Sequence, residues 1–130
     1  MSEKWIGKLS VKLEKWLRKK LGERKARRYS EGIAAILILA ADYGAGNAVA
    51  GMMLRKLGRG VDKVVEMLNG IGCGIAIPRT LPPQQRAVLL LHEIASCIDD
   101  DDARSAVEGL EEYSLSGGRR APSWAEERDH

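Results

Sequence analysis

The sequence predicts an all-α protein in which a basic N-terminal helical arm precedes a compact bundle of four to five helices. Apolar residues recur at intervals of three and four through most of the 130-residue chain, which is the period of an amphipathic helix. Glycines and prolines separate these segments, and no segment alternates apolar and polar residues convincingly enough to predict a sheet. The chain lacks Phe, so Leu, Ile, Val, Ala and Met must form the core of what we expect to be one domain.

The first predicted helix is amphipathic, and its two faces are chemically distinct. At about 100° per residue, one arc of roughly 160° holds the apolar residues. These residues are Trp5, Ile6, Leu9, Leu13, Trp16, Leu17 and Leu21. The next arc, of roughly 120°, is a cationic stripe formed by Lys4, Lys8, Lys12, Lys15, Arg18 and Lys19. Lys20 is the one cation within the apolar arc, and the positive charge continues beyond the helix in Arg24, Lys25, Arg27 and Arg28.

The middle of the chain predicts three more helices. Residues 33–41 are apolar almost all round, so we expect a central helix that is buried on most sides. Asn47 is a suitable N-cap for a helix over 48–57, which Gly58 and Gly60 are expected to end. A third, short helix ending near residue 70 is predicted by the i, i+3, i+4, i+7 repeat of Val61, Val64, Val65 and Leu68.

The last part of the chain predicts an irregular connection, two helices and a tail. Glycines and prolines make residues 71–83 irregular, with 75–77 as a candidate extended piece, and Pro82 and Pro83 suit the first turn of a helix that runs to about Ile98. The acidic run 99–102 favours the start of a final helix, because carboxylates stabilise the positive end of the helix dipole.

We expect that final helix to reach about Tyr113 and residues 114–130 to form a flexible polar tail. The predicted organisation is therefore a basic amphipathic arm over 1–30, a helical bundle over 31–113, and the tail over 114–130.

Signatures of catalysis, cofactors and metals are not found in the sequence. Gly44-Ala45-Gly46 opens like a dinucleotide fingerprint, but no strand precedes it and no phosphate-binding Lys follows. His92 and the two cysteines lack metal-finger spacing, and the acidic run fails the calcium-loop pattern. We expect a protein that is not an enzyme and that needs neither cofactor nor metal.

Cys73 and Cys97 are too few for a disulfide scaffold. One bridge is compatible with the sequence, but their spacing does not establish it, and we expect both as buried small apolar residues. The N-terminal segment lacks the apolar stretch of a secretory signal, so we expect an intracellular protein. The apolar run 33–41 has about half the length of a membrane span.

Charge is strongly segregated along the chain. The first 28 residues hold eleven Lys/Arg and three Glu, whereas the segment from Asp99 onward holds four Arg and ten Asp/Glu. A basic segment on a near-neutral body predicts a polyanionic partner, and evenly spread Lys and Arg suit sequence-independent contacts with the phosphates of double-stranded DNA. The same pattern also suits an anionic membrane surface, or a solvated face without a ligand.

The first 70 residues combine a basic N-terminal arm with Tyr43-Gly44, Leu54-Arg55-Lys56-Leu57-Gly58, Val61 and Met67-Leu68-Asn69-Gly70. In these features the chain resembles the major coat proteins of rod-shaped and filamentous archaeal viruses. The resemblance implies that arm helices wrap double-stranded DNA in its A-form, that the eleven arm cations line the DNA, and that homo- or hetero-oligomers of coat subunits stack as a helical filament. It also implies a location in the virion, and in the host cytoplasm before assembly.

A second resemblance covers eleven residues only. Leu81-Pro82-Pro83-Gln84-Gln85-Arg86-Ala87-Val88-Leu89-Leu90-Leu91 is similar to the first helix of the promoter-binding region of small alternative sigma factors. The recognition helix of that family has no counterpart in the residues that follow. A small helical DNA-binding regulator is therefore an alternative function, and a membrane-active amphipathic protein is another.

Overall fold

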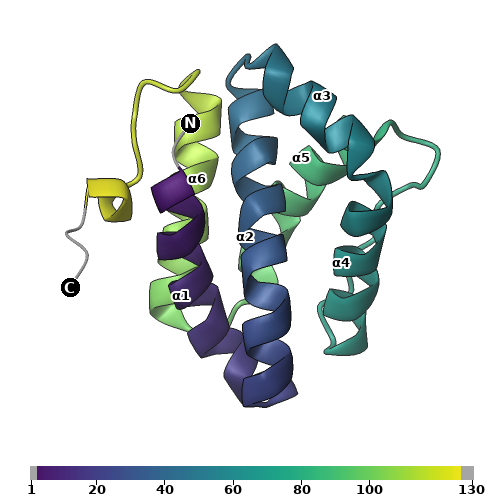
Figure 1. Ribbon diagram of the computed structural model, residues 1–130, viewed down its shortest axis with the longest axis vertical. Coiled ribbons are helices and arrows are strands. Elements are labelled where there is room, and N and C mark those ends of the chain that lie inside the picture. Colours follow the sequence, from purple (N-terminus) through teal and green to yellow (C-terminus); the bar gives the residue numbers. More distant parts are fainter. Residues whose placement is uncertain (1–2, 127–130) are drawn as a thin grey trace.

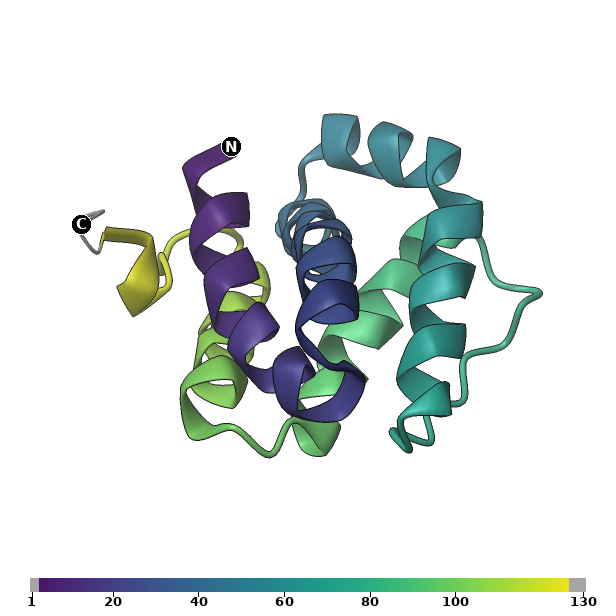
Figure 2. The same cartoon turned by 60° about the horizontal axis from the view of Figure 1, so that its bottom comes forward.

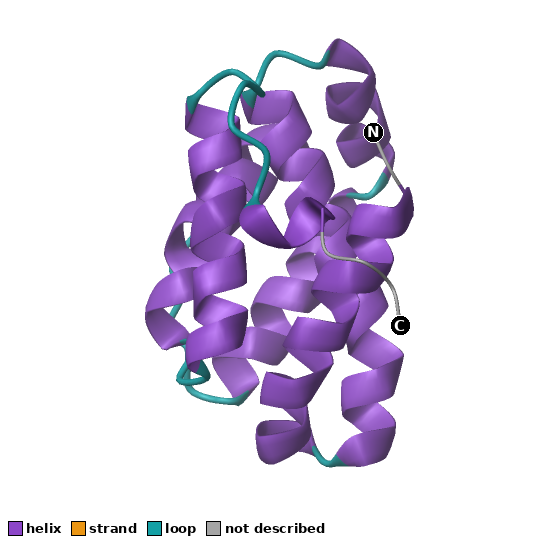
Figure 3. Ribbon diagram, turned by 90° about the vertical axis from the view of Figure 1, so that its left-hand side faces the viewer, coloured by secondary structure: helices purple, strands orange, loops and turns teal. Residues whose placement is uncertain are grey.

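The computed structural model describes residues 3–126, and this part of the chain is a helical bundle without strands (Figures 1 and 3). The all-α fold class is thereby confirmed. The α-helices are α1 (Glu3–Leu21), α2 (Glu23–Gly44), α3 (Ala48–Lys56), α4 (Gly58–Gly70), α5 (Pro83–Ile94) and α6 (Asp101–Leu115). Two short 3₁₀ helices, η1 (Ala95–Cys97) and η2 (Ser123–Glu126), complete the described elements. None of the described helices is long and apolar enough to cross a membrane.

The basic N-terminal segment packs as helix α1 on the rest of the bundle and does not extend from it as an arm. Gly22 has a φ of +83°, a backbone conformation that residues with a side chain rarely adopt, and it reverses the chain between α1 and α2. The two helices lie side by side as a hairpin (Figure 1). Their contact excludes solvent from the apolar arc of α1, so that four of its side chains are fully buried: Leu9, Leu13, Trp16 and Leu17. The expected boundary between residues 30 and 31 is wrong, because α2 continues through it.

Helix α2 is the central element, as its apolar character predicts. Residues Ile33, Leu37 and Ile38 have no exposed surface, and α1, α3, α5 and α6 all pack against this helix. Near its C-terminal end, the buried Asp42 accepts a hydrogen bond of 2.7 Å from the Tyr113 hydroxyl of α6. Burial, followed by this hydrogen bond to a carboxylate, raises the pKa of Tyr113 to about 12.

The helix ends follow local signals in most places. Asn47 caps α3, since its side chain accepts hydrogen bonds from the backbone N–H groups of Val49 and Ala50 at 3.0 and 3.2 Å. Pro82 and Pro83 stand at the start of α5, which ends at Ile94 and not at Ile98, because η1 tightens the last turn. Gly58 and Gly60 were expected to end α3. Instead α3 ends at Lys56, and both glycines lie in the first turn of α4.

The connection between α4 and α5 is irregular, as predicted, and it loops out beside α4 (Figure 2). The Asn69 side chain holds the first part of this connection against α4. It accepts a hydrogen bond of 2.6 Å from Ile75 N and donates one of 2.9 Å to Ile75 O. The candidate extended piece at 75–77 forms no strand.

A disulfide joins Cys73 in this connection to Cys97 at the end of η1. The expectation of two separate, buried apolar cysteines is therefore wrong: both side chains are only partly buried, and they are bonded to each other. The bond ties the start of the connection to the far end of α5, which the sequence separation of 24 residues alone does not reveal.

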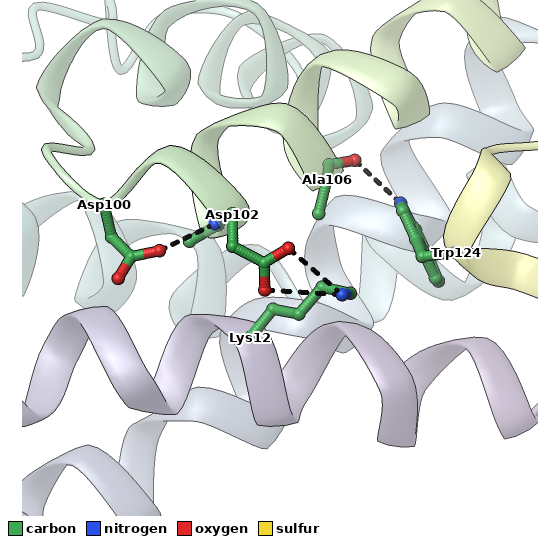
Figure 4. A network of polar contacts seen from close by, with 6 residues as sticks. Lys12, Asp100, Asp102, Ala106 and Trp124 are labelled. Carbon is green, nitrogen blue, oxygen red and sulfur yellow. Dashed lines mark hydrogen bonds and ion pairs between the residues drawn. The ribbon is translucent and has the colours of Figure 1, made fainter. Parts of the chain in front are cut away.

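The C-terminal segment is anchored, at least as far as residue 126. Trp124 is 3% exposed, and its ring nitrogen donates a hydrogen bond of 2.9 Å to the Ala106 carbonyl of α6 (Figure 4). Its ring meets that of Trp5 edge-on, with centroids 5.8 Å apart. The expected flexible tail over 114–130 is thus contradicted for its described part, because a buried aromatic side chain holds it on α1 and α6. Residues 127–130 lie outside the described residues.

We predict that reduction of the Cys73–Cys97 bond lowers the free energy of unfolding by about 3 kcal/mol, since the bond limits the conformations of the unfolded chain. Urea denaturation with and without a reductant measures this difference. A Cys73→Ser/Cys97→Ser variant should match the reduced protein and be insensitive to the reductant. Equal stability of the oxidised and reduced proteins would contradict the prediction.

Candidate nucleic-acid interface

The turn at Gly22 divides the eleven predicted site residues into two groups. Helix α1 carries seven of them, Lys4, Lys8, Lys12, Lys15, Arg18, Lys19 and Lys20, and α2 carries the other four, Arg24, Lys25, Arg27 and Arg28. The structure does not form the continuous basic helix that the charge pattern predicts. It brings the last turn of α1 next to the first two turns of α2, at the lower end of the molecule in Figure 1.

The cationic stripe of α1 faces the acidic run at the start of α6 (Figure 4). Lys12 Nζ lies 3.4 Å from a carboxylate oxygen of Asp102, and the exposed fraction of the Lys12 side chain is only 14%. Further along α1, Lys20 Nζ lies 3.0 Å from Asp99 Oδ2. Lys19 Nζ lies 3.7 Å from Asp100 Oδ2. The acidic run therefore neutralises part of the stripe within the same chain.

The pKa values of two of these carboxyl groups reflect the pairing. The hydrogen bond from Lys20 is the largest influence on Asp99 and lowers its pKa below the usual 3.8. The pKa of Asp100 is also lowered, first by the hydrogen bond that its side chain accepts from Ala103 N and then by the charges of Lys15 and Lys19. Asp100 thus caps α6 and attracts α1 with the same carboxylate.

The first turns of α1 do not contribute to a shared surface with the basic start of α2. Lys8 Nζ donates a hydrogen bond of 2.9 Å to the Ala125 carbonyl, so this lysine holds the C-terminal segment. Lys4 and Lys8 stand at the opposite end of α1 from Gly22. Lys4 and Lys8 therefore lie apart from the cations on the two sides of Gly22.

We define the hairpin end as the cluster of seven cations around Gly22. Its members are Arg18, Lys19, Lys20, Arg24, Lys25, Arg27 and Arg28, and all seven are exposed. Within the described residues, Arg24, Lys25 and Arg28 have no carboxylate within 4.0 Å. Arg27 pairs with Glu23 at 3.5 Å, but both side chains are more than 70% exposed, so water screens this pair strongly.

The hairpin end is chemically suited to bind an extended polyanion and not a small ligand. Its side chains are long and solvated, and they surround only a shallow depression lined by Glu23, Arg24, Arg27 and Arg28. Arg28 is partly fixed, because its guanidinium carbon lies 5.7 Å from the centre of the Tyr29 ring.

Outside the hairpin end, a polar pair joins α5 and α6. His92 and Glu111 lie 3.3 Å apart on α5 and α6, and burial raises the pKa of Glu111. No set of three His, Cys, Asp or Glu side chains that could hold a metal ion is present among the described residues.

Comparison of the chain with protein-family models, with curated proteins and with solved structures finds no match.

Our sequence analysis missed the partner of the acidic run. The run was expected to start a helix, and the structure shows that it also meets α1 of its own chain. The signal in the sequence was the opposite charge of two segments. The acidic run and the cationic face of α1 attract each other when their helices lie side by side.

We predict that the pairing of Asp99 with Lys20 stabilises the folded protein at neutral pH and that this contribution disappears in acid. The pKa of Asp99 is lowered by folding, so its contribution is present above pH 3.8 and is lost as the pH falls through the pKa of the folded state. Urea denaturation of wild type and Asp99→Asn should show different stabilities at neutral pH, and the stabilities should converge as the pH falls through the lowered pKa of Asp99.

A Lys20→Gln background is the control for this titration. In that background Asp99→Asn should change stability much less at neutral pH, because the partner charge is absent. A difference between wild type and Asp99→Asn that is independent of pH would refute the assignment.

Proposed function

We propose that the protein coats double-stranded DNA, that the hairpin end binds phosphates without reading bases, and that it acts as a coat subunit of a filamentous virus. The observation that carries the DNA-binding proposal is the exposure of seven cations at one end of the molecule, three of them without a carboxylate partner in the described chain. Long Lys and Arg side chains suit phosphate contacts, which supply affinity independently of sequence.

The fold favours docking of the hairpin end over wrapping by a detached arm. Detachment of α1 would expose Leu9, Leu13, Trp16 and Leu17, which are fully buried. Truncation of even one buried aromatic residue typically costs about 3–5 kcal/mol, so exposure of all four side chains is strongly unfavourable. We therefore place the DNA against the turn between α1 and α2.

Two alternatives receive less support from the geometry. A regulator that reads bases needs a helix that enters the major groove. Helix α6, which follows α5, begins with Asp101 and Asp102 after the N-cap Asp100, and these carboxylates repel phosphates. A membrane-active helix would place its Trp side chains in the headgroup region, whereas Trp16 is fully buried.

The coat-subunit part of the proposal rests on the resemblance of residues 1–70 and on one apolar surface. Helix α3 and the residue after it expose Val49, Met52, Met53 and Leu57, with exposed fractions of 39% to 64%. Clustered apolar exposure of this kind is typical of a contact with another protein. In a filament, this surface would meet a neighbouring subunit while the hairpin end meets DNA.

Removal of three cations from the hairpin end should weaken DNA binding and flatten its salt dependence. For Arg24→Gln/Lys25→Gln/Arg27→Gln, we expect the slope of log K against log salt to decrease by about 0.9 for each phosphate that the variant no longer neutralises. Fluorescence anisotropy with duplexes of unrelated sequence, across a salt series, measures both the slope and the absence of sequence preference.

The matched control removes three cations from the opposite end of the molecule, with Arg55→Gln/Lys56→Gln/Arg59→Gln on α3 and α4 (Figure 1). This variant should bind DNA nearly as the wild type does. Equal weakening in both triple variants would mean that net charge alone attracts DNA, and a strong preference for one sequence would favour a regulator.

We further predict that neutralising the acidic partners of α1 strengthens DNA binding. Asp99→Asn/Asp100→Asn releases Lys20 and Lys19 to bind phosphates, and Asn at position 100 remains a good N-cap. The salt dependence should become steeper by up to about 0.9 for each lysine that binds an additional phosphate. A Glu108→Gln/Glu112→Gln variant removes the same charge from the exposed side of α6 and should have a smaller effect. Weaker DNA binding by the first variant would contradict the role of the hairpin end.

A further inference from the structure

Six large apolar side chains are exposed in the described part of the chain, and four of them lie together on α3 and the residue after it. We call these four residues the α3 face: Val49, Met52, Met53 and Leu57. The other two, Val11 on α1 and Leu115 on α6, lie apart from this cluster in the sequence. Single exposed apolar residues are ordinary on a monomer, whereas a cluster indicates a contact with another surface.

Only cations border the α3 face in the sequence. No Asp or Glu occurs between Asp42 and Asp62, whereas this segment holds Arg55, Lys56 and Arg59. None of these three cations has a carboxylate within 4.0 Å among the described residues. Two α3 faces that met each other would place these cations against other cations or against apolar side chains. The α3 face therefore favours a partner surface that is apolar and acidic.

The exposed side of α6 has both properties near its C-terminal end. Glu108, Glu112 and Leu115 follow the spacing i, i+4, i+7, so they lie on one face of α6, and all three are exposed. We call these three residues the Leu115 surface. Within the described chain, neither glutamate has a cation within 4.0 Å, and the nearby Arg104 pairs with Asp101 instead. The Leu115 surface thus offers the negative charge that the α3 face lacks.

The remaining exposed apolar residue, Val11, lies in basic surroundings. Lys8 and Lys15 are one turn away from it on either side along α1. The one glutamate a turn away, Glu14, pairs with Arg18 at 2.9 Å. The cations beside the α3 face would meet like charges there, so Val11 is a poor counterpart for α3.

Antiparallel packing of α3 on α6 matches charge and apolar contact at once. Val49 precedes Lys56 by seven residues on α3, and Glu108 precedes Leu115 by seven residues on α6. Seven residues rise about 10 Å along a helix and return to the same face. When the two helices run in opposite directions, Lys56 therefore meets Glu108 while Val49 meets Leu115. Residues 119 and 120, which are arginines, then lie beyond Val49, next to the uncharged segment 43–48.

From these patterns we infer that the α3 face binds the Leu115 surface of a second copy of this chain. The contact joins two different surfaces, so a copy that is bound through α3 still offers its own α6 to another copy, and the contact can repeat. Its role in a filament rests on the proposed coat function, but the contact itself needs no DNA. It is small, so we expect low affinity between free copies.

The test is sedimentation equilibrium of the wild-type protein without DNA, in low salt, at concentrations up to about 1 mM. We expect reversible association that added salt weakens, because opposite charges attract each other across the contact. Arg55→Glu/Lys56→Glu and Glu108→Lys/Glu112→Lys should each weaken association at least tenfold, since like charges then meet. A wild-type protein that stays monomeric, or an association that salt does not weaken, would overturn the inference.

Combining the two charge reversals identifies the partner surface. The chain with all four substitutions has the wild-type net charge of +3, and it should associate about as tightly as the wild type because opposite charges meet again. The matched control combines Arg55→Glu/Lys56→Glu with Glu31→Lys/Glu93→Lys on α2 and α5, which also restores the net charge. This control should remain as weak as Arg55→Glu/Lys56→Glu alone. Equal recovery in both combinations, or recovery in neither, would refute the pairing of α3 with α6.

A second pair of variants tests the apolar part of the contact. Leu115→Ser should weaken association several-fold, whereas Val11→Ser, at a similarly exposed position on α1, should leave it unchanged. Equal effects of these two substitutions would contradict the proposed contact.

DNA binding and self-association can be measured separately. On a duplex with room for a single copy, Leu115→Ser should bind as the wild type does. The hairpin-end variant Arg24→Gln/Lys25→Gln/Arg27→Gln should associate with itself as the wild type does. Failure of the DNA-binding proposal and failure of this inference are therefore distinguishable. Loss of self-association in the hairpin-end variant would place the contact at the hairpin end and overturn the inference.

Discussion

The need to cover the apolar face of α1 governs the rest of the structure. Four large side chains of this face, Trp16 among them, have no exposed surface, and the turn at Gly22 brings α2 against them. Once α1 is folded back, its cationic stripe has a fixed direction and can meet the acidic start of α6. The same turn gathers the cations on both sides of Gly22 at one end of the bundle. Hydrophobic burial of α1 thus determines where the cations lie on the surface, although the hydrophobic effect itself depends only on apolar area.

Local signals predicted the helices well, because each depends on neighbouring residues only. Asn47 caps α3, the prolines start α5, and the acidic run starts α6, all of which follow from the hydrogen-bonding and dipole requirements of helix ends. Helical periodicity likewise identified the apolar face of α1 and the central position of α2. Fold class was therefore accessible from the sequence.

The larger errors concern the arrangement of segments in space. Gly22 lies in a sequence whose helical pattern and charge continue on both sides, so periodicity alone did not reveal a reversal there. The bond between Cys73 and Cys97 and the docking of Trp124 depend on how helices are arranged in space. The candidate site was predicted by composition and position in the sequence, but its division into neutralised and solvated cations required the placement of α6 beside α1.

The aromatic cluster at the chain ends has a consequence for synthesis of the protein. Trp5 lies 5.0 Å from the Tyr113 ring and 5.8 Å from the Trp124 ring, between ring centroids, so its cover comes from the last part of the chain. Helices α1 and α2 can pair as soon as both have left the ribosome, because a single residue separates them. The N-terminal turn of α1 nevertheless lacks the cover of both rings until residue 124 has been translated. A chain that ends before Tyr113 therefore exposes more of the Trp5 ring than a chain that reaches Trp124.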